Sequence, residues 1–76
     1  MSDTHANYLR DLGSALRADA VDARRESERG GDFERGQAFA FYRVISLMQQ
    51  QADAFGLSRR EVALEGLDPE RDLLGS

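Results

Sequence analysis

The hydrophobic pattern is strongest between residues 33 and 55. On a helix, at about 100° per residue, the apolar side chains of this stretch form two adjacent rows. One row has the alternating three- and four-residue spacing of helix-on-helix packing. The first row is Ala38, Phe41, Ile45, Met48, Ala52 and Phe55, and the second is Phe33, Ala40, Val44 and Leu47. Together they cover close to half of the circumference, more than the ~100° stripe of a helix with one neighbour. We therefore expect this helix to have more than one partner helix.

Polar residues of the same stretch predict its limits and its solvated side. Gln37 and Gln51 fall inside the apolar arc and indicate a polar contact or the edge of an interface. Asp32 is placed to cap the first amides, and Gly56 stands where a left-handed residue closes a helix. The opposite side is expected to face solvent and carries Arg35, Arg43, Ser46, Gln49, Gln50 and Asp53.

A second helix is predicted over residues 4–28, with a narrower apolar stripe. The stripe consists of Leu9, Leu12, Leu16, Ala20 and Ala23. Gly30 and Gly31 break the chain between the two stretches, and a connection this short joins antiparallel neighbours. The two helices are therefore predicted to form an antiparallel helical hairpin.

The chain after Gly56 contains two further helix starts. Ser58 and Glu61 form a capping box, which predicts a short helix over 59–65 that ends at Gly66. Asp68 followed by proline predicts a final helical turn over 69–74. The leucines of this tail allow it to fold back on the hairpin, although a two-turn helix would cover only about one end of the 33–55 helix.

The uncovered length of the 33–55 helix predicts a partner. The expected fold is a single all-α domain, a hairpin plus a short C-terminal helix, which dimerises into a four-helix bundle. A compact monomer and a complex with a different protein are the alternatives. The predicted self-association interface comprises Leu9, Leu12, Leu16, Phe41, Val44, Ile45, Met48 and Phe55. An external protein partner is expected to contact Phe39, Tyr42, Leu73 and Leu74.

Composition narrows the classes of protein. The 76 residues can form one domain and contain no cysteine, so disulfides and thiolate metal sites are excluded. The first residues have neither a basic start nor an apolar segment, and no run reaches the ~20 apolar residues of a membrane span. The net charge of −4 disfavours general attraction to nucleic acids or anionic membranes. A cytoplasmic protein is expected.

No constellation of residues predicts catalysis. His5 is the only histidine, and no companions stand at metal-ligand spacing. The carboxylates of the 4–28 helix alternate with arginines, as on a solvated helix face. This face carries Asp11, Arg17, Asp22, Arg24 and Glu26. We expect no catalytic, cofactor or metal site, and a non-enzymatic interaction or regulatory module.

Residues 51–64 resemble the core of a helix-turn-helix motif. The resemblance rests on a small residue, a turn glycine four positions later, an apolar residue, a serine cap and a β-branched residue. These are Ala52, Gly56, Leu57, Ser58 and Val62. In that family the second helix enters the major groove of DNA, which would put Arg59 and Arg60 at its leading end. Glu61, Glu65 and the stop at Gly66 favour a tail hinge instead, and a DNA-binding regulator is the alternative function.

Overall fold

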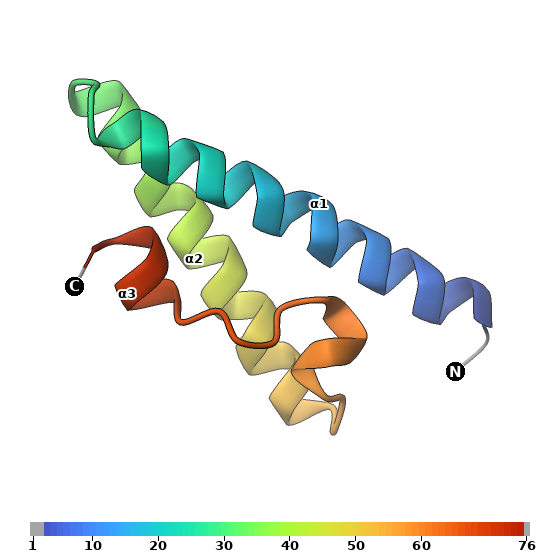
Figure 1. Cartoon of the computed structure of the whole chain (residues 1–76). Coiled ribbons are helices and arrows are strands. Elements are labelled where there is room, and N and C mark those ends of the chain that lie inside the picture. Colours follow the sequence, from blue (N-terminus) through green and yellow to red (C-terminus); the bar gives the residue numbers. More distant parts are fainter. Residues whose placement is uncertain (1–2, 76) are drawn as a thin grey trace.

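Two long helices and a short C-terminal tail make up the protein. The computed structural model describes residues 3–75. Helix α1 spans Asp3–Ser27 and helix α2 spans Asp32–Ala54, and the chain reverses between them at the two glycines. The tail contains one 3₁₀ turn, η1 (Arg59–Val62), and the short helix α3 (Pro69–Leu73). No strand occurs in residues 3–75. The predicted all-α architecture, with two long helices and a short third, is confirmed (Figure 1).

Local hydrogen bonds account for the ends of α2. The carboxylate of Glu34 accepts a hydrogen bond from the Gly31 N–H at 3.0 Å, and the helix already begins at Asp32. Asp32 therefore lies in the first turn, where it pairs with Arg35, and the prediction that it caps the helix is wrong. At the other end Gly56 has a φ of +73°, as predicted for a left-handed residue that closes a helix.

The tail starts its two short helical segments at the predicted residues. The Ser58 hydroxyl accepts from the Glu61 N–H at 3.3 Å, and the Glu61 carboxylate accepts from the Ser58 N–H at 2.8 Å. The Asp68 carboxylate accepts from the N–H groups of Glu70 and Arg71, with Pro69 in the first turn. Side chains thus satisfy amides that a helix start leaves without partners.

The helix predicted over 59–65 is much shorter in the structure. It is a four-residue 3₁₀ turn that ends at Val62, and Ala63 follows with a left-handed φ of 59°. Residues 63–68 then run as irregular chain to α3. An irregular chain can span up to about 3.3 Å per residue, against 1.5 Å in a helix. The tail therefore reaches much further along α2 than the single end predicted for it.

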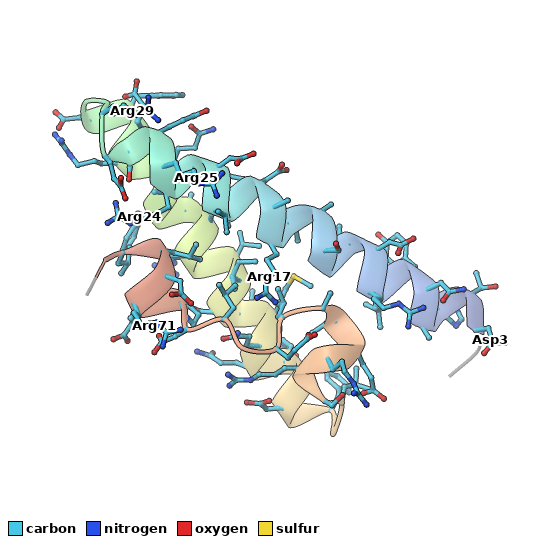
Figure 2. The ribbon with its side chains drawn as sticks, viewed as in Figure 1. Asp3, Arg17, Arg24, Arg25, Arg29 and Arg71 are labelled. Atoms are coloured by element: carbon cyan, nitrogen blue, oxygen red, sulfur yellow. The ribbon has the colours of Figure 1, made fainter. Side chains whose placement is uncertain are left out.

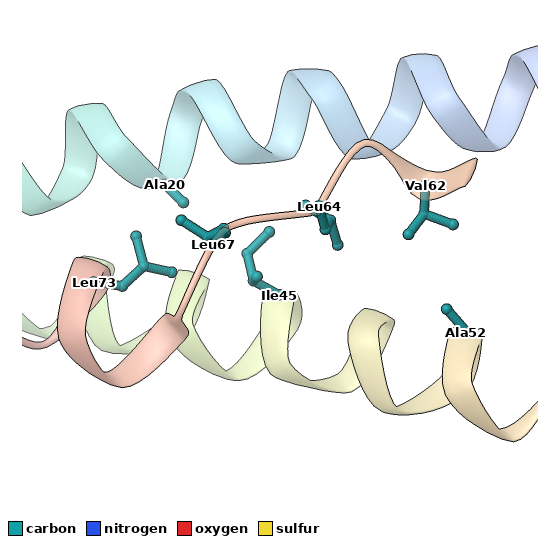
Figure 3. Packing of buried hydrophobic residues seen from close by; sticks show 7 residues of the cluster. All are labelled: Ala20, Ile45, Ala52, Val62, Leu64, Leu67 and Leu73. Atoms are coloured by element: carbon teal, nitrogen blue, oxygen red, sulfur yellow. The ribbon is translucent and has the colours of Figure 1, made fainter. Parts of the chain in front are cut away.

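The tail itself forms the centre of the hydrophobic core. Val62, Leu64, Leu67 and Leu73 enter the space between α1 and α2, and all four are at most 7% exposed (Figure 3). The long helices contribute Ala20, Ile45 and Ala52 to the same cluster. Burial of a leucine side chain contributes about 2 kcal/mol. The tail therefore holds α1 and α2, the two arms of the hairpin, apart. The arms diverge from the turn that joins them (Figure 1).

A buried glycine allows the tail to approach α1 closely. Gly13 lies in the middle of α1, and a Cβ atom at this position would overlap the Val62 carbonyl oxygen. No side chain can fit between the two backbones there. The contact between α1 and η1 therefore requires glycine at position 13.

Two polar side chains hold the irregular part of the tail. Arg17 of α1 donates to the carbonyl oxygens of Ala63 and Glu65, at 3.2 and 2.8 Å. The amide of Gln49 in α2 donates to those of Leu64 and Leu67, at 3.2 and 2.9 Å. Figure 2 shows Arg17 directed towards the tail.

These contacts correct the two predicted solvated faces. Gln49 is only 3% exposed, and Arg17 and Arg24 are half-buried. The guanidinium of Arg24 lies against Gly75 near the end of the described chain. The prediction failed because a polar side chain can be buried when it satisfies backbone carbonyls that would otherwise lose their hydrogen bonds.

Candidate interaction surface

Two of the residues predicted to contact other molecules lie inside the protomer. Ile45 is fully buried and Leu73 is 1% exposed, and both belong to the core between the arms. Neither can touch a second molecule while the protomer stays folded. Their assignment to a binding surface is therefore corrected, because the tail covers the side of α2 that carries Ile45.

The other predicted interface residues divide by exposure. Leu9, Leu16, Phe41 and Met48 are partly buried against the core. The remaining three, Leu12, Val44 and Phe55, are exposed by 38%, 42% and 78%. Three further large apolar side chains that the predicted set did not include are also exposed, namely Tyr8, Phe33 and Leu47. Phe33 and Leu47 belong to the second apolar row of α2, so the periodicity had already marked them.

Helical geometry places most of these exposed residues on one side. Around α2, Gln49 lies about 40° from Ile45 in one direction, whereas Val44 and Leu47 lie about 100–160° in the other. Around α1, the same helical repeat turns Tyr8 and Leu12 to the side of the helix that faces away from Arg17. When two helices run antiparallel, residues that are turned in the same direction around each helix axis lie on the same face of the pair. Since Arg17 and Gln49 bind the tail, the exposed residues occupy the opposite face.

We call this opposite side the uncovered face. It runs along the whole of α2 and over the first half of α1. On α2 it comprises Phe33, Gln37, Ala40, Phe41, Val44, Leu47, Met48, Gln51 and, just after the helix, Phe55; on α1 it comprises Tyr8 and Leu12. None of these side chains is charged, although 32% of the chain is Asp, Glu, Lys or Arg. The second half of α1 brings the exposed carboxylates of Asp19 and Glu26 to the same side, because they repeat the directions of Leu12 and Tyr8 around that helix. The absence of charge is typical of the centre of a protein interface.

A hollow deepens the uncovered face where the two arms diverge. It has a volume of about 460 Å³ and receives side chains from α1, α2 and the tail. Its lining consists of Leu9, Met48, Gln51, Ala52, Phe55, Leu57 and Val62. All but Gln51 are apolar, so the hollow suits an apolar side chain of another molecule.

The predicted surface for an external partner is not a single patch. The rings of Phe39 and Tyr42 stack with their centroids 5.7 Å apart. They point about 120° and 60° away from Ile45 in the direction of the tail, and with Val44 and Leu47 they line a hollow of about 530 Å³ at the edge of the uncovered face. Leu74 is 37% exposed, and its neighbour Leu73 is buried.

Exposed ion pairs account for the shifted pKa values. Two hydrogen bonds from the Arg59 guanidinium, at 3.4 and 3.0 Å, lower the pKa of the Asp53 carboxyl. The Arg71 guanidinium, with help from the Asp68 N–H, likewise lowers the pKa of Asp72. Both pairs lie at the surface beside a polar hollow of about 530 Å³ between α2 and the tail. Because both arginines in its lining are already paired, we assign no chemistry to this hollow.

The segment that resembles a helix-turn-helix motif contains no recognition helix in the structure. The second helix of that motif would be η1, which has four residues. Four residues form one 3₁₀ turn, too short to lie along a DNA groove as a recognition helix does. Arg59, expected at its leading end, is bound to Asp53 of α2. The match describes a capped turn between α2 and the tail.

The search for metal ligands and the comparisons with known proteins identify no further site. Within residues 3–75, no group of three or more His, Cys, Asp or Glu side chains could hold a metal ion. His5 lies exposed in the first turns of α1. In the described part of the chain, no helix combines the length and apolar character needed to cross a membrane. No protein family, curated protein or solved structure matches this chain.

Proposed function

We propose that this protein is a small non-enzymatic interaction module that acts as a homodimer, with the uncovered face as its contact surface. The observation that carries the proposal is the continuous, uncharged row of exposed side chains along α2. Phe33 and Phe55, at its two ends, are exposed by 77% and 78%, and Leu47 by 56%. Single exposed apolar residues are common on proteins, but a continuous apolar face usually marks an interface.

The surface area of the protomer supports a partner. Its accessible surface is 5183 Å², whereas a compact monomer of this mass exposes about 4,700 Å². Its radius of gyration is 13.0 Å, against about 11 Å for a compact chain of this length. The extra surface comes from an elongated shape, 42 × 20 × 16 Å, with one side of the hairpin left open.

The apolar area is also close to what a stable dimer requires. With roughly 200 Å² per aromatic side chain, the exposed parts of Tyr8, Phe33 and Phe55 amount to about 400 Å². Leu12, Val44 and Leu47, together with the partly exposed side chains beside them, extend this area. Stable interfaces bury about 800 Å² on each partner, so a second copy on this face would suffice.

Sedimentation equilibrium tests the proposal directly. The wild-type protein is expected at twice its 8.5 kDa chain mass at micromolar concentration. Leu47→Glu places a charge at the centre of the face and should weaken dimerisation at least about a hundredfold, because the carboxylate would be buried without a partner. Leu47 is exposed in the protomer, so helicity should not change.

Gln50→Glu is the matched control for this experiment. Gln50 lies on the same stretch of α2, is exposed, and points about 120° away from Val44, at the rim of a hollow that Leu47 also lines. The same charge at this position should leave the dimer intact. A wild-type protein that sediments at the mass of one chain up to high micromolar concentration would refute the homodimer.

A further inference from the structure

The uncovered face of α2 has a mirror pattern of residue types centred on Val44. Eleven residues to either side stand Phe33 and Phe55, and seven residues to either side stand Gln37 and Gln51. Closer in, four residues away, Ala40 mirrors Met48, and three residues away Phe41 mirrors Leu47. Any helical stripe has symmetrical spacing, since it follows the helical repeat. Matching residue types at equal distances are not required by that repeat.

This pattern is what a two-fold contact between antiparallel copies of one helix would use. In such a contact, residue i meets residue j of the other copy, and j meets i. With the axis at Val44, each phenylalanine at one end would meet the phenylalanine at the opposite end, and each glutamine would meet the other glutamine. Ala40 would meet Met48, so a small side chain would lie opposite a large one.

We propose that α2 packs antiparallel against α2 of a second copy, about a two-fold axis at Val44; this inference rests on the homodimer proposed above. A parallel pair would place each residue against itself, with Ala40 facing Ala40 and Met48 facing Met48. Interdigitation of large and small residues packs an interface better than pairing of equals. A parallel pair would also not require matching residue types at equal distances from Val44.

The glutamines set the register of the proposed contact. Gln37 and Gln51 are exposed in the protomer and are the polar side chains of the α2 part of the face. An amide both donates and accepts hydrogen bonds, so the Gln37 amide satisfies the Gln51 amide of the second copy. A shift along the helix would bury both amides against apolar residues. Polar residues in apolar helix interfaces determine register in this way.

The first half of α1 extends the contact at both ends. Leu9 of α1 and Phe55 line the same hollow, so the N-terminal half of α1 lies at the Phe55 end of α2. In the antiparallel pair, Phe33 of the second copy arrives at this end. Tyr8 and Leu12, on the same face, then flank the two phenylalanines. A parallel pair would bring both α1 N-terminal halves to one end and leave the other end uncovered.

A pair of double variants tests orientation and register. Gln37→Glu with Gln51→Lys places opposite charges opposite each other in the antiparallel pair and like charges opposite each other in a parallel pair. Gln37→Glu with Gln51→Glu places like charges together in both. The expected dissociation constant of the first variant is within about threefold of wild type, and that of the second is at least tenfold weaker. Both are measured by sedimentation at low salt, where charge effects are least screened.

The other outcomes separate this inference from the proposed function. If the wild type dimerises and both double variants are weakened equally, or neither is weakened, the antiparallel register is wrong and the dimer stands. If the wild type is monomeric, both proposals fall. Circular dichroism of each variant verifies that the protomer is folded.

Cysteine cross-linking gives an independent test of the axis. The chain contains no cysteine, so Val44→Cys introduces a single thiol. A residue on the two-fold axis faces its own copy, and disulfides form when the Cα atoms are about 4.4–6.8 Å apart. Mild oxidation should link Val44→Cys into covalent dimers and leave Gln37→Cys unlinked, because Gln37 meets Gln51 in the antiparallel pair, whereas a parallel pair would link both variants. Arg43→Cys, about 100° around α2 from Val44, should also stay unlinked. A dimeric protein whose Val44→Cys variant stays unlinked would overturn the inference.

Discussion

Two polar residues show how single side chains position the tail. Gln49 and Arg17 come from different helices and together bind four backbone carbonyls of the segment from Ala63 to Leu67. This segment is irregular, so its carbonyls have no regular secondary structure to satisfy them. A buried carbonyl without a hydrogen bond costs about 1–3 kcal/mol. The carbonyls of Leu64 and Leu67 are buried and therefore depend on Gln49, whereas the Arg17 hydrogen bonds are partly buried or exposed.

Gln49→Glu is expected to destabilise the protomer strongly. The substitution keeps the shape of the side chain but replaces a donor amide with a carboxylate facing two carbonyl oxygens. The free energy of unfolding, measured with urea at neutral pH, should fall by about 3 kcal/mol. Gln50→Glu, the same change on an exposed neighbour, should alter it by less than about 0.5 kcal/mol. Equal effects of the two variants would show that the Gln49 hydrogen bonds do not hold the tail.

At the scale of the elements, the contact between α1 and η1 depends on a glycine that helix formation alone disfavours. Glycine in a helix interior costs about 1 kcal/mol relative to alanine. Gly13 is tolerated there because the Val62 carbonyl lies against it. Gly36, in α2, is exposed, and a Cβ atom added there would meet nothing within 4 Å. The two glycines therefore have the same low helix propensity, but only at Gly13 does a neighbouring backbone exclude a Cβ atom.

Gly13→Ala and Gly36→Ala are expected to change stability in opposite directions. At position 13 the methyl group would overlap the backbone of η1, and the free energy of unfolding should fall by about 1–3 kcal/mol. At position 36 the methyl group meets no atom, and stability should rise by about 0.5–1 kcal/mol. Thermal unfolding followed by circular dichroism gives both values. A stabilising Gly13→Ala would contradict the close packing of η1 on α1.

At the scale of the whole molecule, the tail divides the hairpin into two unlike faces. On one face it supplies the core leucines and their polar supports. On the other face the apolar surface of α2 stays open, and the protomer is longer than a compact chain of its size. One tail cannot cover both faces of an extended hairpin. The open face is the part of the molecule that a second copy is proposed to cover.

Stability should consequently depend on protein concentration. If dimerisation is linked to folding, a tenfold increase in chain concentration stabilises the dimer by about 1.4 kcal/mol. The urea midpoint of the wild type should rise with concentration, because unfolding separates the chains. Leu47→Glu, expected to be monomeric, should show a midpoint that does not change. A constant wild-type midpoint over a hundredfold range of concentration would argue against a dimer in this range.

The sequence predicted the features that depend on neighbours along the chain. The two long helices, the break at Gly30, the capping box of Ser58 and the left-handed Gly56 follow from hydrogen bonds and backbone angles within a few residues. The all-α fold and the width of the apolar arc on α2 follow from the helical repeat. The second apolar row also marked the surface that the structure leaves uncovered.

Tertiary structure alone decided which side of each helix became buried. The path of the tail placed Ile45 and Leu73 inside the protomer, turned Gln49 from a solvent-facing residue into a buried donor, and gave Gly13 its role. A pattern of apolar and polar types cannot reveal these contacts, because each joins residues far apart in the chain. Interactions between residues close in the chain determine the helices of this protein, and long-range packing determines which of their faces stay exposed.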